Sequence, residues 1–303
     1  MVPRVSICIP TFNRKDYLAQ TLASVYSQTY TNYEVIVVDD GSTDATGDFI
    51  RQAQYDRMRY YWQKNAGDAA ARNKLIGLAQ GEFITFIDSD DLLLPDSVER
   101  MVEAMDSASD DVIVYGPYLR IDEHGTVCGR SKRKILRSGY ITKYLFQDIQ
   151  VHSCGSMFPR KALVKAGGFD ESLKVCSDYD LWLRLSLEYR FIAIPDPTFK
   201  RRRHSENLST ICAKNQIKEL EVLERFYYEN RQNVDMARRV AMRRLSKEEY
   251  RVGKYFLRER NFEMSACYFQ KSFFRHPGVK ALFMWVLSSL KQKLPRIQQQ
   301  KIY

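Results

Sequence analysis

The sequence predicts an α/β protein in which a domain with a mostly parallel β-sheet precedes a smaller, all-helical region. Apolar, strand-like runs alternate with helical periodicity through residues 1–90, a pattern typical of a parallel sheet covered on both faces. From about residue 211 the pattern is helical throughout, and the net charge changes from −1 over residues 1–210 to +11 over residues 211–303. We therefore expect an α/β domain at 1–210 and a basic helical region at 211–303.

The alternation is regular in the first ninety residues. Strand-like runs begin at residues 5, 35, 58 and 83, and each of the first three is followed by a segment with apolar residues at helical spacing. Polar sequences follow the runs in turn, namely PTFNR, DDGS, KNAGDAAARN and DSDD. Ligands of such sheets bind outside the carboxyl ends of the strands. One acidic loop alone could be a solvated turn, but together these loops predict a single crevice.

Residues 112–210 have a more mixed pattern. A hairpin is expected to turn near Gly125, and a basic, glycine-bounded loop covers residues 129–139. A helix with an apolar face then runs into a strand between residues 178 and 195, with Trp182 in the core. This part completes the predicted α/β domain.

The composition fits a soluble globular protein, with 45% hydrophobic and 28% charged residues in 303. The six cysteines form no CxxC pair and no zinc-site spacing, so we interpret them as reduced and structural. The first residues lack the features of a signal peptide, which favours the cytoplasm. The late apolar run at 281–290 is shorter than the roughly 20 residues that span a bilayer, so no transmembrane helix is expected.

Three carboxylates, Asp88, Asp90 and Asp91, follow the fourth apolar run directly. Like charges this close need solvent or a cation. Asp88 and Asp90 are two residues apart and point to the same side of an extended segment, and hard oxygen ligands suit Mg²⁺ or Mn²⁺. The alternative for Asp91, and for Asp96 after Pro95, is that they cap the next helix.

These motifs, followed by GGFDESL and SDYDLWLRL, resemble in this order the family 2 glycosyltransferases with a GT-A fold, a Rossmann-like nucleotide-sugar-binding fold. The resemblance covers roughly residues 3–210. It implies a metal-dependent, inverting transferase that uses a nucleotide-diphosphate sugar, most plausibly a UDP-sugar, and Mn²⁺ or Mg²⁺. It also implies a glycan or lipid-linked saccharide as acceptor, in cell-surface polysaccharide synthesis.

By this resemblance, DSD is the DXD motif, with Asp90 as metal ligand and Asp88 nearer the ribose. Asp40 contacts uracil, Arg72 lies on the phosphate side, and His204 contacts the metal or the diphosphate. Without this context Arg72 is a solvated helix residue, and His204 has a surface or capping role as an equal alternative. The remaining residues that we assign to the donor site are Pro10, Thr11, Phe12, Asn13, Arg14, Asn65, Gly67 and Ser89. Lys200 and the arginines before His204 could offset diphosphate charge, although only some can face the site.

Asp178 occupies the position of the family's catalytic aspartate, the base that takes the acceptor proton. Ser177 stands where the family usually has Glu, a departure that weakens the match. The alternative is that Ser177 or Asp178 simply caps the helix that follows. Both roles are compatible, because a helix N-terminus also orients a carboxylate.

In the basic region, Gly253, Phe256, Phe269 and Pro277 have spacings that resemble one tetratricopeptide-like hairpin, which must pack on neighbouring helices or on the first domain. Residues 279–303 fit an interfacial helix on an anionic membrane, with core packing or homodimer formation as an equal alternative. No nucleic-acid-binding module is recognised, so we expect no nucleic acid partner.

Two other functions compete with the transferase. A sugar nucleotidyltransferase would need a glycine-rich loop after the first strand, whereas PTFNRKD contains no glycine. A non-catalytic scaffold that binds membrane or nucleic acid would have no need to keep Asp40, Arg72, Asp90 and Asp178 together.

Overall fold

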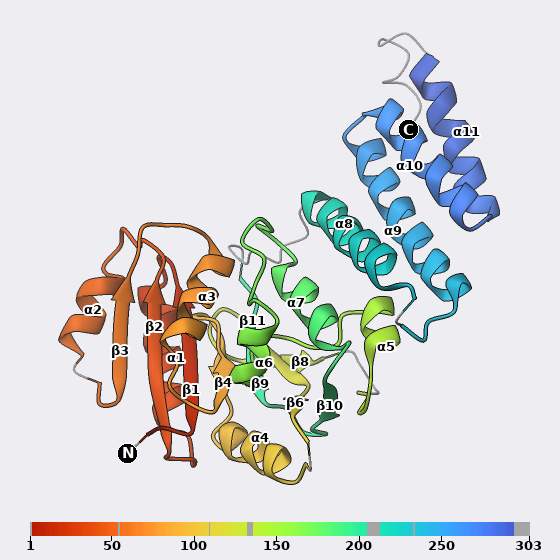
Figure 1. Cartoon of the computed structure of the whole chain (residues 1–303). Helices are drawn as coiled ribbons and strands as arrows, with labels where there is room; N and C mark the ends of the chain where they lie inside the picture. Colours follow the sequence, from red (N-terminus) through yellow and green to blue (C-terminus); the bar gives the residue numbers. More distant parts are fainter. Residues whose placement is uncertain are drawn as a thin grey trace. The chain divides into compact units, whose positions relative to one another are not determined.

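The structure, a computed structural model, describes residues 2–53, 55–108, 110–131, 136–204, 213–232 and 234–293 (Figure 1). The chain divides into two compact units, Met1–Leu208 and Ser209–Tyr303. Parts of the predicted basic loop, 132–135, and of the predicted membrane segment, 294–303, lie outside the described residues.

The larger sheet of the first unit has the strand order β10-β6-β9-β4-β1-β2-β3. Its pairs β1–β2, β1–β4, β2–β3 and β6–β10 are parallel, while β9 is antiparallel to both of its neighbours. The strands are β1 (Val5–Thr11), β2 (Tyr33–Asp39), β3 (Met58–Trp62), β4 (Phe83–Phe86), β6 (Val112–Tyr115), β9 (Ser156–Pro159) and β10 (Arg190–Ala193). The prediction of a mostly parallel sheet is confirmed.

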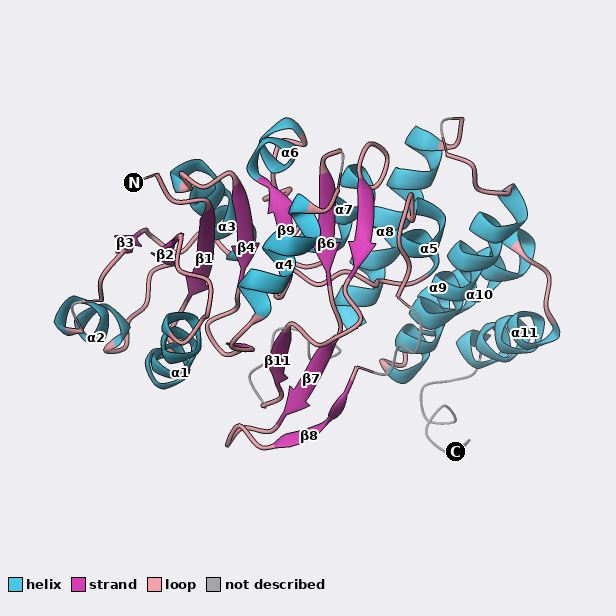
Figure 2. Cartoon of the chain, turned by 90° about the horizontal axis from the view of Figure 1, so that it is seen from below, coloured by secondary structure: helices cyan, strands magenta, loops and turns pink. Residues whose placement is uncertain are grey.

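Helices cover this sheet on both sides, which explains why β1, β2 and β4 are buried along their whole length. Figure 2 shows α1 (Lys15–Tyr26) and α3 (Asp68–Leu78) on opposite sides of the sheet. One hydrophobic cluster joins Leu22 of α1 and Met101 of α4 (Ser97–Asp106) to Ile7 and Ile9 of β1. The remaining helices of this unit are α2 (Thr46–Gln52), α5 (Thr142–Gln147), α6 (Arg160–Lys165) and α7 (Ser177–Leu185).

A smaller sheet has the order β5-β11-β7-β8. It consists of β5 (Leu92–Leu93), β7 (Tyr118–Ile121), β8 (Val127–Arg130) and β11 (Phe199–Arg202). The predicted hairpin is β7–β8, and its turn places Gly125 at a φ of 89°, in the left-handed region that glycine tolerates. Because β11 pairs with both β5 and β7, residues near position 200 lie beside the acidic loop after β4.

The helix that precedes β10 is buried, as its apolar pattern predicts. Trp182 of α7 stacks on Phe158 of β9, with ring centroids 4.5 Å apart. This contact confirms that Trp182 belongs to the core and packs α7 against the larger sheet.

The second unit contains α8 (Ala213–Asn230), α9 (Arg238–Arg258), α10 (Phe262–Arg275) and α11 (Val279–Lys293), and consecutive helices pack on one another. Helices α9 and α10 approach closely at Gly253. A Cβ atom on Gly253 would lie 2.9 Å from the ring of Phe269, and Ser265 Oγ donates to the Gly253 carbonyl at 3.0 Å. Among the described residues, no helix combines the length and apolar character needed to cross a bilayer.

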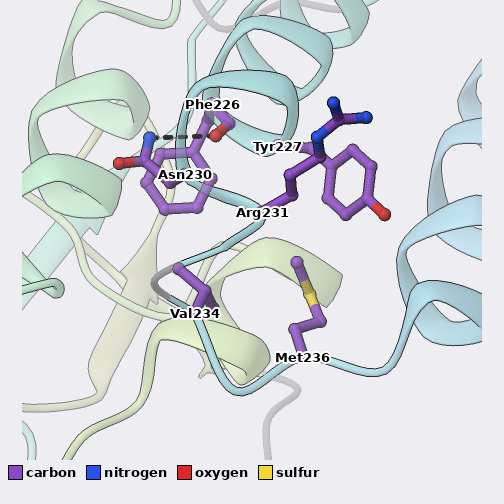
Figure 3. A pocket seen from close by; sticks show the side chains of 6 residues that line it. All are labelled: Phe226, Tyr227, Asn230, Arg231, Val234 and Met236. Atoms are coloured by element: carbon purple, nitrogen blue, oxygen red, sulfur yellow. Dashed lines mark hydrogen bonds between the residues drawn. The ribbon is translucent and has the colours of Figure 1, made fainter.

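The turn after α8 surrounds a small hollow (Figure 3). Its lining residues are Phe226, Tyr227, Asn230, Arg231, Val234 and Met236. The Asn230 amide donates to the Phe226 carbonyl at 2.9 Å, which ties the last turn of α8 together. All of these residues belong to the second unit, and none was predicted to bind the donor.

Candidate active site

The loops after β1 and β2 are joined by Asn13. Its backbone N–H donates to Ser42 Oγ at 2.8 Å, and its side-chain oxygen accepts from the N–H of Thr43 at 2.7 Å. Asn13 has a φ of 51°, a left-handed conformation in which asparagine is enriched. The sequence predicts a donor contact for Asn13, and here its carboxamide fixes the shape of the rim.

Asp40 joins the loop after β2 to the loop before α3. Its buried carboxylate accepts from Gln63 Nε2 at 2.7 Å, from the N–H of Ala66 at 2.9 Å and from the N–H of Gly67 at 2.8 Å. Three donors on one carboxylate fix its orientation. Asp40 therefore holds these two loops together in addition to any contact with a base.

Gly41 allows these two loops to approach. It has a φ of +86°, and a Cβ atom at this position would lie 2.7 Å from the backbone nitrogen of Asn65. Only glycine combines this φ with so close a backbone contact at low cost. The DDG sequence thus has a structural explanation that is independent of ligand binding.

Arg72 joins the start of α3 to the acidic loop. Its Nε donates to Asp68 at 2.8 Å and its Nη2 donates to Asp88 Oδ1 at 2.5 Å, and the guanidinium lies over the ring of Phe86. Arg72 is only 5% exposed, so the solvated-helix alternative is wrong. Its Nη1 is buried without a hydrogen-bond partner among the described residues, which leaves a donor available to an anionic ligand.

The first two carboxylates of the acidic loop have different partners. Asp88 is bound by Arg72, and although burial opposes it, the Arg72 charge lowers the pKa of Asp88 below its ordinary value. Asp90 Oδ2 lies 2.8 Å from Nε2 of His204, whose ring stacks on Tyr17 at 5.0 Å. The structure therefore brings together the two residues predicted to hold a metal. His204 is a buried partner of Asp90, with only 4% of its side chain exposed.

The helix-capping alternative for Asp91 and Asp96 is wrong. Asp91 is buried, and its carboxylate accepts from the backbone N–H of Arg202 at 2.8 Å. Asp96 occupies the N-cap position of α4 but makes no side-chain cap, and instead binds Arg100 at 3.0 Å. Asp91 thus anchors β11 beside the acidic loop.

Burial, followed by the charges of Asp88 and Asp90, raises the pKa of Asp91 well above its ordinary value. Cys154, a free buried thiol, accepts from the N–H of Asp88 at 3.2 Å. Single ligand atoms of Asp88, Asp91 and Cys154 lie within 4.8 Å of one another. The sequence placed Asp91 in the acidic cluster but gave it no site role beyond a possible helix cap. It did not point to Cys154, because a lone cysteine carries no motif.

Successive basic side chains of β11 point to opposite faces of the strand. Arg202 is buried, and its guanidinium donates to the carbonyls of Asp90 at 2.9 Å and Glu123 at 2.8 Å, and to Gln20 at 2.8 Å. Arg202 is therefore a structural residue. Arg201 points the other way, and despite its burial the neighbouring Tyr118, Asp91 and Asp88 raise the pKa of Arg201.

Asp178 lies in the first turn of α7, where it accepts from the N–H of Tyr179 at 2.7 Å. Burial raises the pKa of Asp178, and the charges of Asp68 and Asp88 add to this, while the Tyr179 N–H and Arg72 partly offset it. The N-cap residue of the helix is Cys176, without a side-chain cap, so the capping alternative for Ser177 or Asp178 is wrong. The helix N-terminus orients a carboxylate with raised basicity.

The other predicted donor-site residues lie at the end of β1 or in the loops after β1, β3 and β4. Pro10, Thr11 and Ser89 are buried, Arg14 and Asn13 are partly buried, and Phe12, Asn65 and Gly67 are exposed. Phe12 is 45% exposed, which leaves its ring accessible for stacking. Thr11 Oγ1 is buried with no hydrogen-bond partner in the described part of the chain.

The donor set at the acidic loop fits a divalent cation. The carboxylate of Asp90 and the imidazole of His204 are ligands that Mn²⁺ accepts, and carboxylates also suit Mg²⁺. The thiol of Cys154 is a softer ligand than either ion prefers. These residues therefore fit the hard cation that the sequence predicts.

Comparison with known proteins decides the family. The family described as Glycosyl transferase family 2 matches residues 6–167. The chain belongs to this family. An uncharacterized glycosyltransferase of Rickettsia typhi is 32% identical over 225 residues, which is 73% of this chain and 70% of the relative. Chondroitin synthase of Escherichia coli is 33% identical over 216 residues, 69% of this chain and 30% of that enzyme.

Solved structures confirm the GT-A fold of this family 2 glycosyltransferase. Staphylococcus aureus TarS 1–349 in complex with UDP-GlcNAc has a TM-score of 0.64 at 18% identity, covering 96% of this chain and 82% of that one. The mannosyltransferase PcManGT from Pyrobaculum calidifontis, in complex with GDP-Man and Mn²⁺, has a TM-score of 0.62 at 18% identity, covering 99% and 84%. At these identities the likeness establishes the fold.

Proposed function

We propose that the protein is an inverting, metal-dependent glycosyltransferase that uses a nucleotide-diphosphate sugar, with UDP-sugars as first candidates. The acceptor is a hydroxyl of a glycan or a lipid-linked saccharide, in cell-surface polysaccharide synthesis on the cytoplasmic side of the membrane. The family and the fold support sugar transfer. The relatives TarS and PcManGT, described as complexes with UDP-GlcNAc and with GDP-Man and Mn²⁺, support the donor class and the metal.

One observation carries the proposal. Asp178, Arg72 and Asp88 come from three separate segments of the chain and interact electrostatically. Arg72 binds Asp88 directly, and the charges of Arg72 and Asp88 both act on Asp178. Asp88 is two residues from the Asp90–His204 pair. These charge effects support a proton acceptor close to groups suited to a metal-bound diphosphate, the arrangement that sugar transfer needs.

Each residue then has a role in the reaction. Asp178 accepts the proton of the acceptor hydroxyl while that oxygen bonds to the anomeric carbon, and the nucleoside diphosphate leaves from the opposite face with its bonding electrons. Asp90 and His204 would hold the cation, which when bound offsets the charge of the diphosphate. Arg72 would direct Nη1 to the same phosphates, and Asp40 would accept from the base.

A donor screen tests the proposal as a whole. Nucleotide sugars are incubated with the protein and Mn²⁺, and release of the nucleoside diphosphate is measured with and without EDTA. We expect slow, metal-dependent hydrolysis of one donor. Nucleotide-sugar synthesis from a sugar phosphate and a nucleoside triphosphate, with no hydrolysis of any donor, would instead favour the nucleotidyltransferase.

Asp40→Ala is expected to weaken the binding of uridine by roughly 10- to 100-fold, the scale of a hydrogen bond to a charged group. The substitution removes an acceptor and also releases the N–H groups of Ala66 and Gly67. Calorimetry with uridine measures the effect, and Asp48→Ala, at an exposed ion pair with Arg51, is the matched control. Unchanged uridine affinity in folded Asp40→Ala would show that this carboxylate makes no base contact.

The raised pKa of Asp178 predicts the pH dependence of turnover. The base acts when deprotonated, so activity falls as pH falls through its pKa, and burial places this limb above the ordinary value of 3.8. We expect kcat/KM, measured at saturating Mn²⁺, to fall on the acid side at a higher pH than it would with an exposed aspartate as the base. A profile that stays flat down to the ordinary aspartate range would contradict this assignment.

A further inference from the structure

Helix α11 buries small and polar side chains and exposes large apolar ones, the reverse of an ordinary packed helix. The residues that it buries are Ala281, Ser288 and Lys291, and Ser288 Oγ lies 3.0 Å from Ser265 Oγ of α10. Five of its bulky apolar residues are exposed instead, and Met284, Trp285 and Leu287 are partly buried. A helix that only completed a core would bury the large residues and expose the small and polar ones.

The exposed residues share one face of the helix. Their spacing is three or four residues along most of its length, which is the helical repeat. We define the α11 face as Val279, Leu282, Phe283, Val286 and Leu290, whose exposed fractions are 84%, 40%, 64%, 49% and 59%. Beside it, Phe274 of α10 is 67% exposed and lies 5.6 Å from the ring of Trp285. An apolar patch of this kind on a surface indicates an interaction site.

The charged residues of α11 itself are all positive. No Asp or Glu occurs in the chain after Glu263, while Lys271, Lys280, Lys293 and other cations follow it. The three named lysines are exposed. Two acidic residues of the helical unit, Glu224 and Glu249, are paired with Arg275. An occupant of the α11 face therefore meets apolar side chains and positive charge together.

We propose that the α11 face docks on an anionic lipid surface, with the helix lying along the membrane. Apolar residues would enter the boundary between headgroups and acyl chains while the lysines bind the lipid phosphates. A second copy of the chain fits less well, because pairing two such faces would bring cations together with no carboxylate on α11 to offset them. The inference rests on the second unit and is independent of the proposed catalytic function.

Vesicle co-sedimentation of the full chain tests this docking. Binding is measured on phosphatidylcholine vesicles with and without phosphatidylglycerol, at low and high salt. We expect binding that requires phosphatidylglycerol and weakens with salt. The double variant Phe283→Ser/Val286→Ser should bind at least about tenfold more weakly, because burial of both side chains is lost. Lys280→Gln and Lys293→Gln should each weaken binding by about fivefold.

A control variant also replaces two exposed apolar residues by serine, in the first unit. Val127→Ser/Val164→Ser replaces exposed valines of the first unit, 50% and 56% exposed, and should leave vesicle binding unchanged. Helical content by circular dichroism and UDP affinity should be unchanged in every variant. Binding that is indifferent to lipid charge, or equal in the α11 variants and the control, would overturn the proposal. Light scattering that shows a dimer dissociated by Phe283→Ser/Val286→Ser would assign the face to a second copy instead.

Discussion

Asp178→Asn is expected to lower kcat by at least about a hundredfold, the usual lower scale for removal of a general base, with little change in donor affinity. The amide is nearly isosteric, and its oxygen can still accept from the N–H of Tyr179, so the start of α7 should keep its structure. It cannot take a proton at neutral pH. Turnover is measured with the donor found by the screen and its acceptor, and donor affinity by calorimetry.

Asp180→Asn is the matched control on the same helix. It makes the same change two residues away, at a buried carboxylate that pairs with Arg184 at 2.8 Å. We expect this variant to lower the melting temperature and to keep kcat within a fewfold, the reverse of Asp178→Asn. Near-normal turnover of Asp178→Asn on the acceptor would place the base elsewhere. NMR of the anomeric proton of the product checks inversion separately.

The strands and loops of the first ninety residues could be predicted because their signals are local. A fully buried parallel strand must be continuously apolar, and the residues after it must turn. The apolar runs therefore predict β1, β2 and β4, and the polar residues that follow them predict where a ligand binds. The acidic loop after β4 followed from the same reasoning, whereas its assignment as a DXD motif rests on the resemblance to the family. Once the order of the strands is given, the loops must lie close together, because the carboxyl ends of parallel strands meet at one edge of the sheet.

The parts that escaped prediction depend on pairing between distant segments. Strand β9 is four residues long and antiparallel to β4 and β6, and nothing in its own sequence indicates this direction. It brings Cys154 next to Phe86 and hence to Asp88. A lone cysteine gives no sign of such a neighbour, so its place in the acidic cluster could only come from the fold.

The capping interpretations failed for a related reason. Asp and Ser before a helix often cap it, but Asp91 is instead used by β11, which lies far along the chain. The alternation of side chains along β11 also decides which arginine faces the aspartates of the acidic loop. Arg202 donates to backbone carbonyls and to Gln20, whereas the charges of Asp88 and Asp91 raise the pKa of Arg201. Tertiary contacts thus override local preference where charged residues are concentrated.

Asp90→Asn is expected to abolish most of the metal dependence of UDP binding. In the wild type, Mn²⁺ should strengthen UDP binding, because a cation held by Asp90 and His204 would bridge to the diphosphate. Loss of a partner outside the ligand set commonly costs about 10- to 100-fold in metal affinity, so removal of a ligand should cost at least as much. Calorimetry with UDP in Mn²⁺ and in EDTA measures the difference, and the affinity in EDTA should be nearly the same in both proteins.

The neighbouring residues distinguish two possible ligand sets. If the cation is held by Asp90 and His204, His204→Ala should act in the same direction as Asp90→Asn, while Cys154→Ser should retain the effect of Mn²⁺. Asp91→Asn should mainly lower the melting temperature, because its carboxylate anchors the backbone of Arg202. If instead Asp91→Asn and Cys154→Ser lose the metal effect and Asp90→Asn keeps it, the cation is held by the cluster of Asp88, Asp91 and Cys154. UDP affinity that is equal in Mn²⁺ and EDTA for the wild type would reject metal-dependent donor binding altogether.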